Sequence, residues 1–422
     1  QRDVDRFRLT GELDPESNIQ FGEGGAGTFS DGKLNTGIKS PHIRHVLEAF
    51  VEAGAPEDIL VDAKPHIGTD LLVDVVRNLR RAIEEAGGEV RFLTRLDGLV
   101  LEGGAADRPG VAGAAKGAGG EDGEARVTAV RLVDERTGAA EVFATDCVVL
   151  ACGHSARDTF QMVYEAGADM ARKPFAVGVR IEHPQALVNE AQYGPAAGHA
   201  ALGAADYKLA VKTDDGRGVY SFCMCPGGYV VNASSMKEKT CVNGMSYSGR
   251  SGKNANSAII VSVSPADYGA QDPLDGMHFQ ETLEHKTYQL GNGKIPQQLF
   301  GDYRQNIASQ GYGDFNSQTK GQTCFANLRG LMTEDMEHSF LLGMEHFSNI
   351  IPQFDRSDAI LSGMETRTSS PVRIMRDTNG ESRVHGIYPG GEGAGYAGGI
   401  MSAAMDGLRL ADDVMKRYHP VY

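Results

Sequence analysis

A glycine-rich stretch near the end of the chain has the spacing of a turn that could bind an anion. Residues 393–398 read GAGYAG, a GxGxxG pattern, between an apolar segment at 384–388 and a helical pattern that runs to about residue 417. The backbone N–H groups of such a turn and the positive end of the helix dipole can stabilise a phosphate or an anionic ring. The same spacing is equally typical of a tight strand–helix turn, so both interpretations stay open.

A second GxGxxG pattern, GEGGAG at residues 22–27, lacks the context of a dinucleotide site. No clear strand precedes it and no helix start follows, whereas the dinucleotide fingerprint requires both. The apolar run CVVLAC at residues 147–152, followed by Gly153, is better placed. A continuous apolar run between turn signals predicts a strand buried on both faces, and ligands bind at the carboxyl edge of parallel sheets. The alternative is a core strand with an ordinary glycine turn.

Two neighbouring thiols are the next candidates for chemistry. Cys223 and Cys225 lie on one side of an extended segment, FCMCPGG. Their one-residue spacing does not suit the geometry of a disulfide, and buried thiols usually act as small apolar groups. We therefore favour a structural role and keep Cys225 as a redox candidate. The six cysteines contain no CxxC pair and the twelve histidines no HxH or HxxxH pair, so no metal site is predicted.

The segment METRTSSPVRI, residues 364–374, offers many hydrogen-bond donors. Its hydroxyl groups and the guanidinium group of Arg367 could bind an anion or a carbonyl, so Arg367 is a candidate electrostatic group. An ordinary polar loop explains the same composition equally well.

The elements that must position these groups begin with an α/β region. Its clearest helix spans residues 69–86, with Thr69 as N-cap and Gly87 at its end. A second helix is expected from Ser155 to about residue 166, because Asp158 completes a capping-box-like pattern. Strands are expected at residues 90–93, 99–101, 127–134, 142–143 and 147–152. This order predicts a mostly parallel sheet with a small antiparallel meander.

The remainder of the chain predicts a second region and a return to the first. Residues 103–124, mostly Gly and Ala, indicate a solvated loop. From residue 174 to about 370 an α+β region is expected, with strands at 177–181, 218–222, 229–232 and 258–263 and a helix at 276–290. The last helix is expected to pack on the first region through an apolar face of Ile400, Ala403, Ala404, Gly407, Ala411 and Val414.

Composition excludes several classes of protein. The 422 residues carry a formal net charge of −15, from 41 Lys+Arg and 56 Asp+Glu, which argues against a nucleic-acid-binding surface. No apolar run reaches the roughly 18–20 residues that span a bilayer, and no signal peptide is visible. We therefore expect no membrane association and a cytoplasmic protein.

Several long strings in the sequence occur together in one known family. They are ESNIQFGEGGAGTFSDGKLNT (16–36), HIGTD (66–70), GGEVRF (87–92), VVLACGHSARDTF (148–160), FCMCPGGYVVNA (222–233), NGMSYSGRSGKNANSAI (243–259), TRTSSPVRI (366–374) and IYPGGEGAGYAGGIMSAAMDG (387–407). With them the chain resembles the uncharacterised FAD-dependent dehydrogenases of bacteria, which are related to the glutathione-reductase type of FAD-binding fold. The resemblance covers nearly the whole chain except residues 103–124.

The resemblance implies an FAD-binding domain in two parts, residues 1–170 and 376–422, with an inserted α+β substrate domain at 171–375. It places Glu392 toward the ribityl chain of FAD and helix N–H groups toward the flavin, where they would stabilise an anionic reduced ring. It also gives Lys33 a place along the flavin and makes it, with Cys225 and Arg367, a candidate catalytic group. The implied cofactor-binding residues are Lys33, Asn35, Thr36, Ala151, Gly153, Gly391, Glu392, Gly393, Gly395, Tyr396, Ala397, Gly398, Gly399 and Ile400.

In that family a GxGxxG βαβ unit precedes the segment that matches QRDVDRF, and this sequence starts at Gln1, after it. The resemblance therefore implies that the 422 residues alone bind FAD weakly or not at all. It predicts an FAD-dependent oxidoreductase that acts on a small-molecule substrate, with NADH or NADPH as electron donor, and it leaves the substrate and the oligomeric state open. The alternatives are a nucleotide-binding module without turnover and a flavoprotein that acts on RNA, which the net charge disfavours.

Overall fold

The computed structural model describes residues 2–103, 125–269 and 271–418, so the predicted loop at 103–124 lies, except for Gly103, outside the described residues. The helices and strands form an α/β structure with one large mixed sheet and several small ones. Short 3-10 helices are η1 (Gly25–Phe29), η2 (Glu57–Leu60), η3 (Gly194–Ala196) and η4 (Pro265–Asp267).

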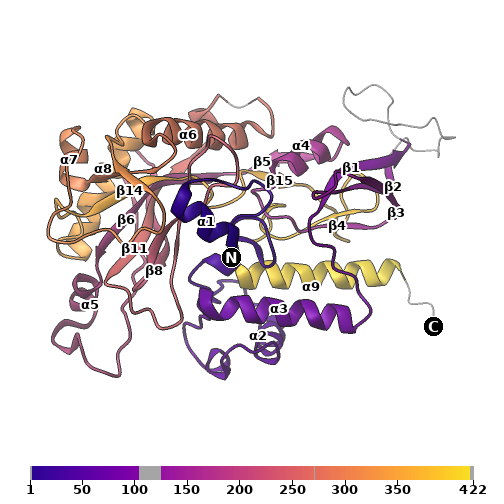
Figure 1. Cartoon of the computed structure of the whole chain (residues 1–422), viewed down its shortest axis with the longest axis horizontal. Helices are drawn as coiled ribbons and strands as arrows, with labels where there is room; N and C mark the ends of the chain where they lie inside the picture. Colours follow the sequence, from indigo (N-terminus) through magenta and orange to yellow (C-terminus); the bar gives the residue numbers. More distant parts are fainter. Residues whose placement is uncertain (1, 104–124, 270, 419–422) are drawn as a thin grey trace.

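A group of helices joins the two ends of the chain. In Figure 1, α9 (Ile400–Arg417) lies alongside α3 (Thr69–Glu85), with α2 (His42–Glu52) below them. The contacts are apolar: Leu72 and Val75 of α3 pack in one cluster with Met401 and Met405 of α9. The prediction that the C-terminal helix packs on the first region is thereby confirmed. The remaining helix of this region, α1, spans Arg2–Thr10.

Small sheets follow beside these helices. Strands β1 (Thr94–Glu102), β2 (Arg126–Asp134) and β3 (Ala140–Ala144) form an antiparallel meander, as predicted. Strand β4 (Val148–Leu150) pairs in parallel with β16 (Ile387–Pro389), and α4 (Arg157–Glu165) follows β4. Strands β5 (Met170–Arg172) and β15 (Val372–Ile374) form a further antiparallel pair. The described strands of this region are thus mainly antiparallel, which corrects the expectation of a mostly parallel sheet.

The large sheet has seven strands in the order β13-β12-β14-β6-β11-β8-β7. Only β12 and β13 pair in parallel among the described strands, so the sheet is mixed. Helix α8 (Glu334–Ile350) packs on one face through Phe340 and Phe347. The other strands and helices between Phe175 and Glu365 are β6 (Phe175–Pro184), α5 (Gln185–Tyr193), β7 (Ala210–Lys212), β8 (Gly218–Cys225), β9 (Tyr229–Asn232), β10 (Val242–Met245), β11 (Asn254–Val263), α6 (Asp275–Gly291), β12 (Ile295–Leu299), α7 (Phe300–Gln305), β13 (Thr323–Phe325) and β14 (Ile360–Glu365).

Two strand predictions need correction. Residues 90–93 form no strand but a turn, in which Phe92 and Leu93 are exposed, and β1 begins only at Thr94. The apolar run at 147–152 yields only the three residues of β4, and it is not buried on both faces, because Val149 is 49% exposed. Its only paired neighbour among the described strands is β16.

The predicted helix caps are also wrong. The N-cap of α3 is Gly68, and the hydroxyl of Thr69 donates to the carbonyl of Thr28. The N-cap of α4 is Ala156 and not Ser155, whose hydroxyl instead donates to Gln20. In both cases a contact with a distant segment replaces the local capping bond.

The buried face of α9 differs by one position from the predicted one. Met401, Met405 and Leu410 are buried, whereas Gly407 and Ala411 are exposed. The prediction counted small residues and passed over the methionines, whose larger apolar surface favours their burial. Among the described residues, no helix combines the length and the apolar character needed to cross a membrane.

Candidate functional site

The parallel strands β4 and β16 bring the two main groups of predicted cofactor residues together. Leu150 and Pro389 are paired at the ends of these strands, and the N–H of Gly390 donates to the carbonyl of Leu150 at 2.9 Å. Because parallel strands end at the same edge, the loops that follow them, 151–156 and 390–399, leave side by side. Ala151 and Gly153 therefore lie next to the Gly391–Ile400 segment, and helices α4 and α9 start from the same edge.

A histidine–glutamate pair joins these two loops. The Nδ1 of His154 lies 2.7 Å from both carboxylate oxygens of Glu392, and the backbone N–H of His154 donates to Oε2 at 3.3 Å. The N–H of Ser370 donates to Oε1 at 2.9 Å. Although burial alone would raise it, the pKa of Glu392 falls below its usual value because His154 and these N–H groups stabilise the carboxylate.

The other imidazole nitrogen of His154, Nε2, has no hydrogen-bond partner among the described residues. His154 is only 8% exposed, and its Nε2 makes no hydrogen bond within the described part of the chain. Buried polar atoms are nearly always hydrogen-bonded in proteins, so an unpaired one calls for a ligand or a water molecule. Because Glu392 holds Nδ1, the imidazole is fixed with Nε2 as its available nitrogen.

Glycines control how closely the loops approach. A Cβ on Gly393 would lie 2.5 Å from the carbonyl oxygen of Gly153, so the two loops pack backbone against backbone. Gly398 and Gly399, by contrast, have nothing within 4 Å of the place where a Cβ would be. Gly399 is the N-cap of α9 and supplies no side chain to its N–H groups. The start of α9 is therefore open to a ligand on this side.

Arg367 is engaged inside the protein. Its guanidinium group donates to both oxygens of Glu284, at 3.0 and 2.9 Å, and Arg157 binds the same carboxylate at 2.9 and 3.2 Å. The third nitrogen of Arg367 donates to Ser155 at 3.1 Å and to Ser235 at 2.5 Å. Burial opposes ionisation of Glu284, but the two arginines outweigh it and hold its pKa well below the usual value. This cluster fastens α4 to α6.

Lys33 lies at the far end of a loop that starts at η1. At the near end, a Cβ on Gly27 would lie 3.5 Å from the side chain of Ile400 at the start of α9. At the far end, the ammonium group of Lys33 donates to the carbonyl of Met224 in β8 and lies 3.6 Å from Asp31. Lys33 thus contacts the segment of the two thiols. Of the other residues predicted in this loop, Asn35 is exposed and Thr36 is partly buried.

Tyr396 points away from the open glycines. Its ring packs in the cluster that contains Phe160 and Ile387, and the guanidinium carbon of Arg376 lies 3.7 Å from the ring centroid. Its backbone N–H donates to the carbonyl of Gly391 at 3.1 Å. Tyr396 therefore stabilises the turn, and Gly395, at φ 86°, makes the turn possible next to Arg373.

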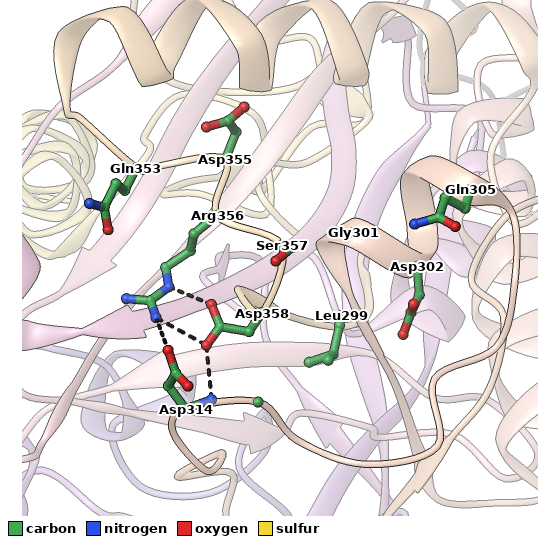
Figure 2. A pocket seen from close by; sticks show the side chains of 11 residues that line it. Leu299, Gly301, Asp302, Gln305, Asp314, Gln353, Asp355, Arg356, Ser357 and Asp358 are labelled. Atoms are coloured by element: carbon green, nitrogen blue, oxygen red, sulfur yellow. Dashed lines mark hydrogen bonds and ion pairs between the residues drawn. The ribbon is translucent and has the colours of Figure 1, made fainter.

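A pocket of about 740 Å³ lies elsewhere, between α7 and the loop before β14. Figure 2 shows Arg356 between Asp314 and Asp358; its Nη2 donates to their carboxylates at 3.3 and 3.0 Å. Asp302 accepts from Ser309, and Asp355 accepts from Arg304 and Ser348. No residue of this pocket is among the predicted cofactor residues, and no metal-binding group of side chains occurs in the described residues.

Comparison with known proteins places the chain in a family. Residues 174–368 match the model of the family described as FAD-dependent protein, C-terminal domain-like. The chain is also 43% identical over 420 residues to a protein of Clostridium beijerinckii that is named only as an uncharacterized protein. The match covers 98% of this chain and 74% of that relative. The chain belongs to the same family as this relative, and its residues 174–368 belong to the family described as FAD-dependent protein, C-terminal domain-like.

The geometry at the edge of β4 and β16 fits the flavin part of FAD, the cofactor that the description of the matching family suggests. FAD presents a flat ring with hydrogen-bonding edges and an anionic reduced form, and the edge of β4 and β16 offers an unpaired imidazole nitrogen and an open helix start. Both features come from residues at the ends of parallel strands, where nucleotide cofactors commonly bind.

His154 was missed by the sequence analysis. It was judged only by its spacing to other histidines, which is the signal of a metal site, and its partner Glu392 is 238 positions away. The available signal was its place directly after a strand that ends in glycine. The role of Ser155, as a hydrogen-bond partner of Gln20 and Arg367, had no signal in the sequence either.

Proposed function

We propose that this protein is an FAD-dependent oxidoreductase with a glutathione-reductase-like FAD-binding domain, formed by residues 1–170 and 376–422, and an α+β substrate domain at 171–375. The observation that carries the proposal is the His154–Glu392 pair at the shared edge of β4 and β16, with Nε2 unpaired. An imidazole fixed by a carboxylate at one nitrogen is an arrangement suited to proton transfer at the other.

In this proposal the flavin lies against the loops after β4 and β16. Ala151, Gly153 and the backbone from Gly391 to Ile400 would hold it, with Lys33, Asn35 and Thr36 on the loop that begins at η1. When bound, FAD supplies hydride or electron transfer. The chain supplies the open N–H groups of α9, the fixed imidazole of His154 and the packing that keeps both in place.

The reaction needs a proton to move with the electrons, and His154 is placed to hold one. Glu392 accepts from Nδ1, so Nε2 can accept a proton in the neutral imidazole and donate one in the imidazolium form. A small-molecule substrate would meet the flavin where the seven-stranded sheet adjoins this edge, and NADH or NADPH would be the electron donor.

The experiment is an anaerobic titration of the purified protein, saturated with FAD, with NADH and then with NADPH. We expect loss of the oxidised flavin absorption with one of the two nucleotides. His154→Gln, which keeps the size of the side chain, should bind FAD but slow this reduction or remove its pH dependence. Binding of FAD without reduction by either nucleotide would favour a nucleotide-binding module without turnover, and equal rates of reduction in the wild-type protein and in His154→Gln would refute the proposed role of His154.

A further inference from the structure

A β-bulge in strand β8 changes how its two cysteines are placed. Strand β11 pairs Ala258 with Phe222 and Asn256 with Cys225, so two steps along β11 correspond to three along β8. Cys223 lies in the bulge with φ 43°, a left-handed conformation that is uncommon outside glycine. Bulges of this kind re-aim side chains and are frequent near active sites.

The extra residue moves Cys225 to the polar face of the sheet. With regular alternation from Phe222, Cys225 would point to the opposite face, whereas the bulge sets it beside Asn256 and Arg180. Its Sγ lies 3.8 Å from a guanidinium nitrogen of Arg180 and 3.2 Å from the carbonyl oxygen of Cys223. The side chains of Cys223 and Cys225 also influence the ionisation of each other.

Two cationic side chains lie near this pair, and each of them is ion-paired with a carboxylate, Arg180 with Glu365 and Lys33 with Asp31. Arg180 is fully buried, and the same nitrogen that approaches Cys225 donates to the carbonyl of Cys223 at 3.2 Å. Lys33 donates to the carbonyl of Met224, between the two cysteines. The Cys225 thiol, Arg180 and Lys33 together outweigh the effect of burial and lower the pKa of Cys223 to about 6, while the pKa of Cys225 is raised.

The two thiols differ in access. Cys223 is partly exposed, whereas Cys225 is fully buried. An accessible thiolate with a second thiol in contact is the arrangement of an attacking and a resolving cysteine. The one-residue spacing had argued against a disulfide in an extended strand, but the bulge replaces the extended geometry at this point.

We propose that Cys223 and Cys225 form a redox-active dithiol that exchanges with disulfide compounds, a site distinct from the His154–Glu392 pair. The Cys223 thiolate attacks one sulfur of a disulfide, forms a mixed disulfide and releases the first thiolate. Cys225 then loses its proton and attacks the Cys223 sulfur, which closes the internal disulfide and releases the second thiolate. The two protein thiols are oxidised by two electrons, the added disulfide is reduced to two thiols, and Cys223 is the attacking residue.

The test uses the reduced protein, oxidised glutathione and peptide mass spectrometry. We expect the peptide with Cys223 and Cys225 to lose the mass of two hydrogens and two glutathione thiols to be released for each disulfide formed. In Cys225→Ser the resolving thiol is missing, so glutathione should stay bound to Cys223. Cys152, an exposed thiol outside the cluster, is the internal control, because glutathione that reacts there has no resolving thiol in contact.

Alkylation as a function of pH gives a second measure. The rate at Cys223 should reach half its maximum near the pKa of about 6, well below that of an ordinary thiol. The charged and titratable groups that face the pair are Arg180, Glu365, Lys33, Asp31 and each cysteine itself.

Two results would overturn the proposal. One is wild-type protein that keeps glutathione on Cys223 as fully as Cys225→Ser does; the other is modification of Cys152 while Cys223 stays unmodified. If Cys225→Ser does not fold, the wild-type protein alone decides, because the internal disulfide either forms or does not.

Discussion

Glu392→Gln is the substitution that most directly tests the pair at the edge of β4 and β16. The carboxylate accepts from three groups, the backbone N–H of His154, the Nδ1–H of His154 and the N–H of Ser370. A glutamine keeps one acceptor oxygen and turns the other position into an NH2 donor, so at least one buried N–H loses its partner. An unsatisfied buried donor costs about 1–3 kcal/mol, and the charge-assisted bond to His154 is weakened as well. We expect a loss of about 2–4 kcal/mol in the free energy of unfolding near neutral pH.

Urea unfolding of both proteins from neutral to acid pH supplies the assay. The pKa of Glu392 is lowered in the folded state, so its stabilising effect is complete above the usual value near 4.5. That effect is lost as pH falls through the lower folded value, and Glu392→Gln has no such group to titrate. The difference between the two proteins should therefore shrink in acid. Equal stability at neutral pH, or a difference that persists unchanged in acid, would refute the reasoning.

Two further substitutions test the supports of the site. Glu284→Gln leaves two buried arginines around a neutral side chain and should lower the free energy of unfolding in urea by about 3–5 kcal/mol. As a control, Glu281→Gln, at a side chain 21% exposed, should lower it by less than about 1 kcal/mol. Similar losses in the two variants would show that burial of the Glu284 cluster does not determine its contribution to stability. Gly393→Ala places a Cβ 2.5 Å from the carbonyl oxygen of Gly153 and should lower the free energy of unfolding, measured without added flavin, by about 1–3 kcal/mol. As a control, the Cβ of Gly398→Ala meets nothing within 4 Å, so this variant should change the free energy of unfolding by less than about 0.5 kcal/mol. Equal effects of the two alanines would contradict the close packing of the loops.

Elements with a strong local pattern could be predicted from the sequence. The helix expected at 69–86 is α3, the strand expected at 127–134 is within β2, and the helix expected at 276–290 is within α6. In each the periodicity of apolar residues matches the burial that the fold imposes. The parallel pairing of the strand after residue 147 was also predicted, because a short apolar run with a glycine turn is typical of such strands.

Features that depend on distant partners could not be predicted. Ser155 and Thr69 have the residue types of helix caps, but each bonds to a segment far away in the sequence. Helix α8 went unpredicted because apolar residues are spread around it: Phe340 and Phe347 are buried, yet Ile350 on the same helix is exposed.

The two loops of the candidate site could be predicted from the sequence, but the contact between them could not. The glycine-rich segments after residues 150 and 389 indicated where a ligand could approach, and pairing of β4 with β16 joins them. The pairing of His154 with Glu392, and the bulge that turns Cys225, follow from strand register, which sequence spacing does not encode. The geometry therefore makes Cys223, and not Cys225 alone, a candidate for the reactive thiol.

One segment, residues 25–33, contacts both the start of α9 and strand β8. Its first turn lies against the start of α9, and Lys33 at its end donates to the bulge of β8. His154 and Glu392 come from the loops after β4 and β16, whereas the two cysteines come from the seven-stranded sheet. Because the clusters share no side chain, a substitution in one leaves the direct contacts of the other in place. A protein that binds and reduces FAD but forms no internal disulfide would support the His154–Glu392 pair as part of a cofactor site and exclude the two cysteines as a redox site. A protein that forms the disulfide but does not bind or reduce FAD would support the dithiol and exclude the cofactor site.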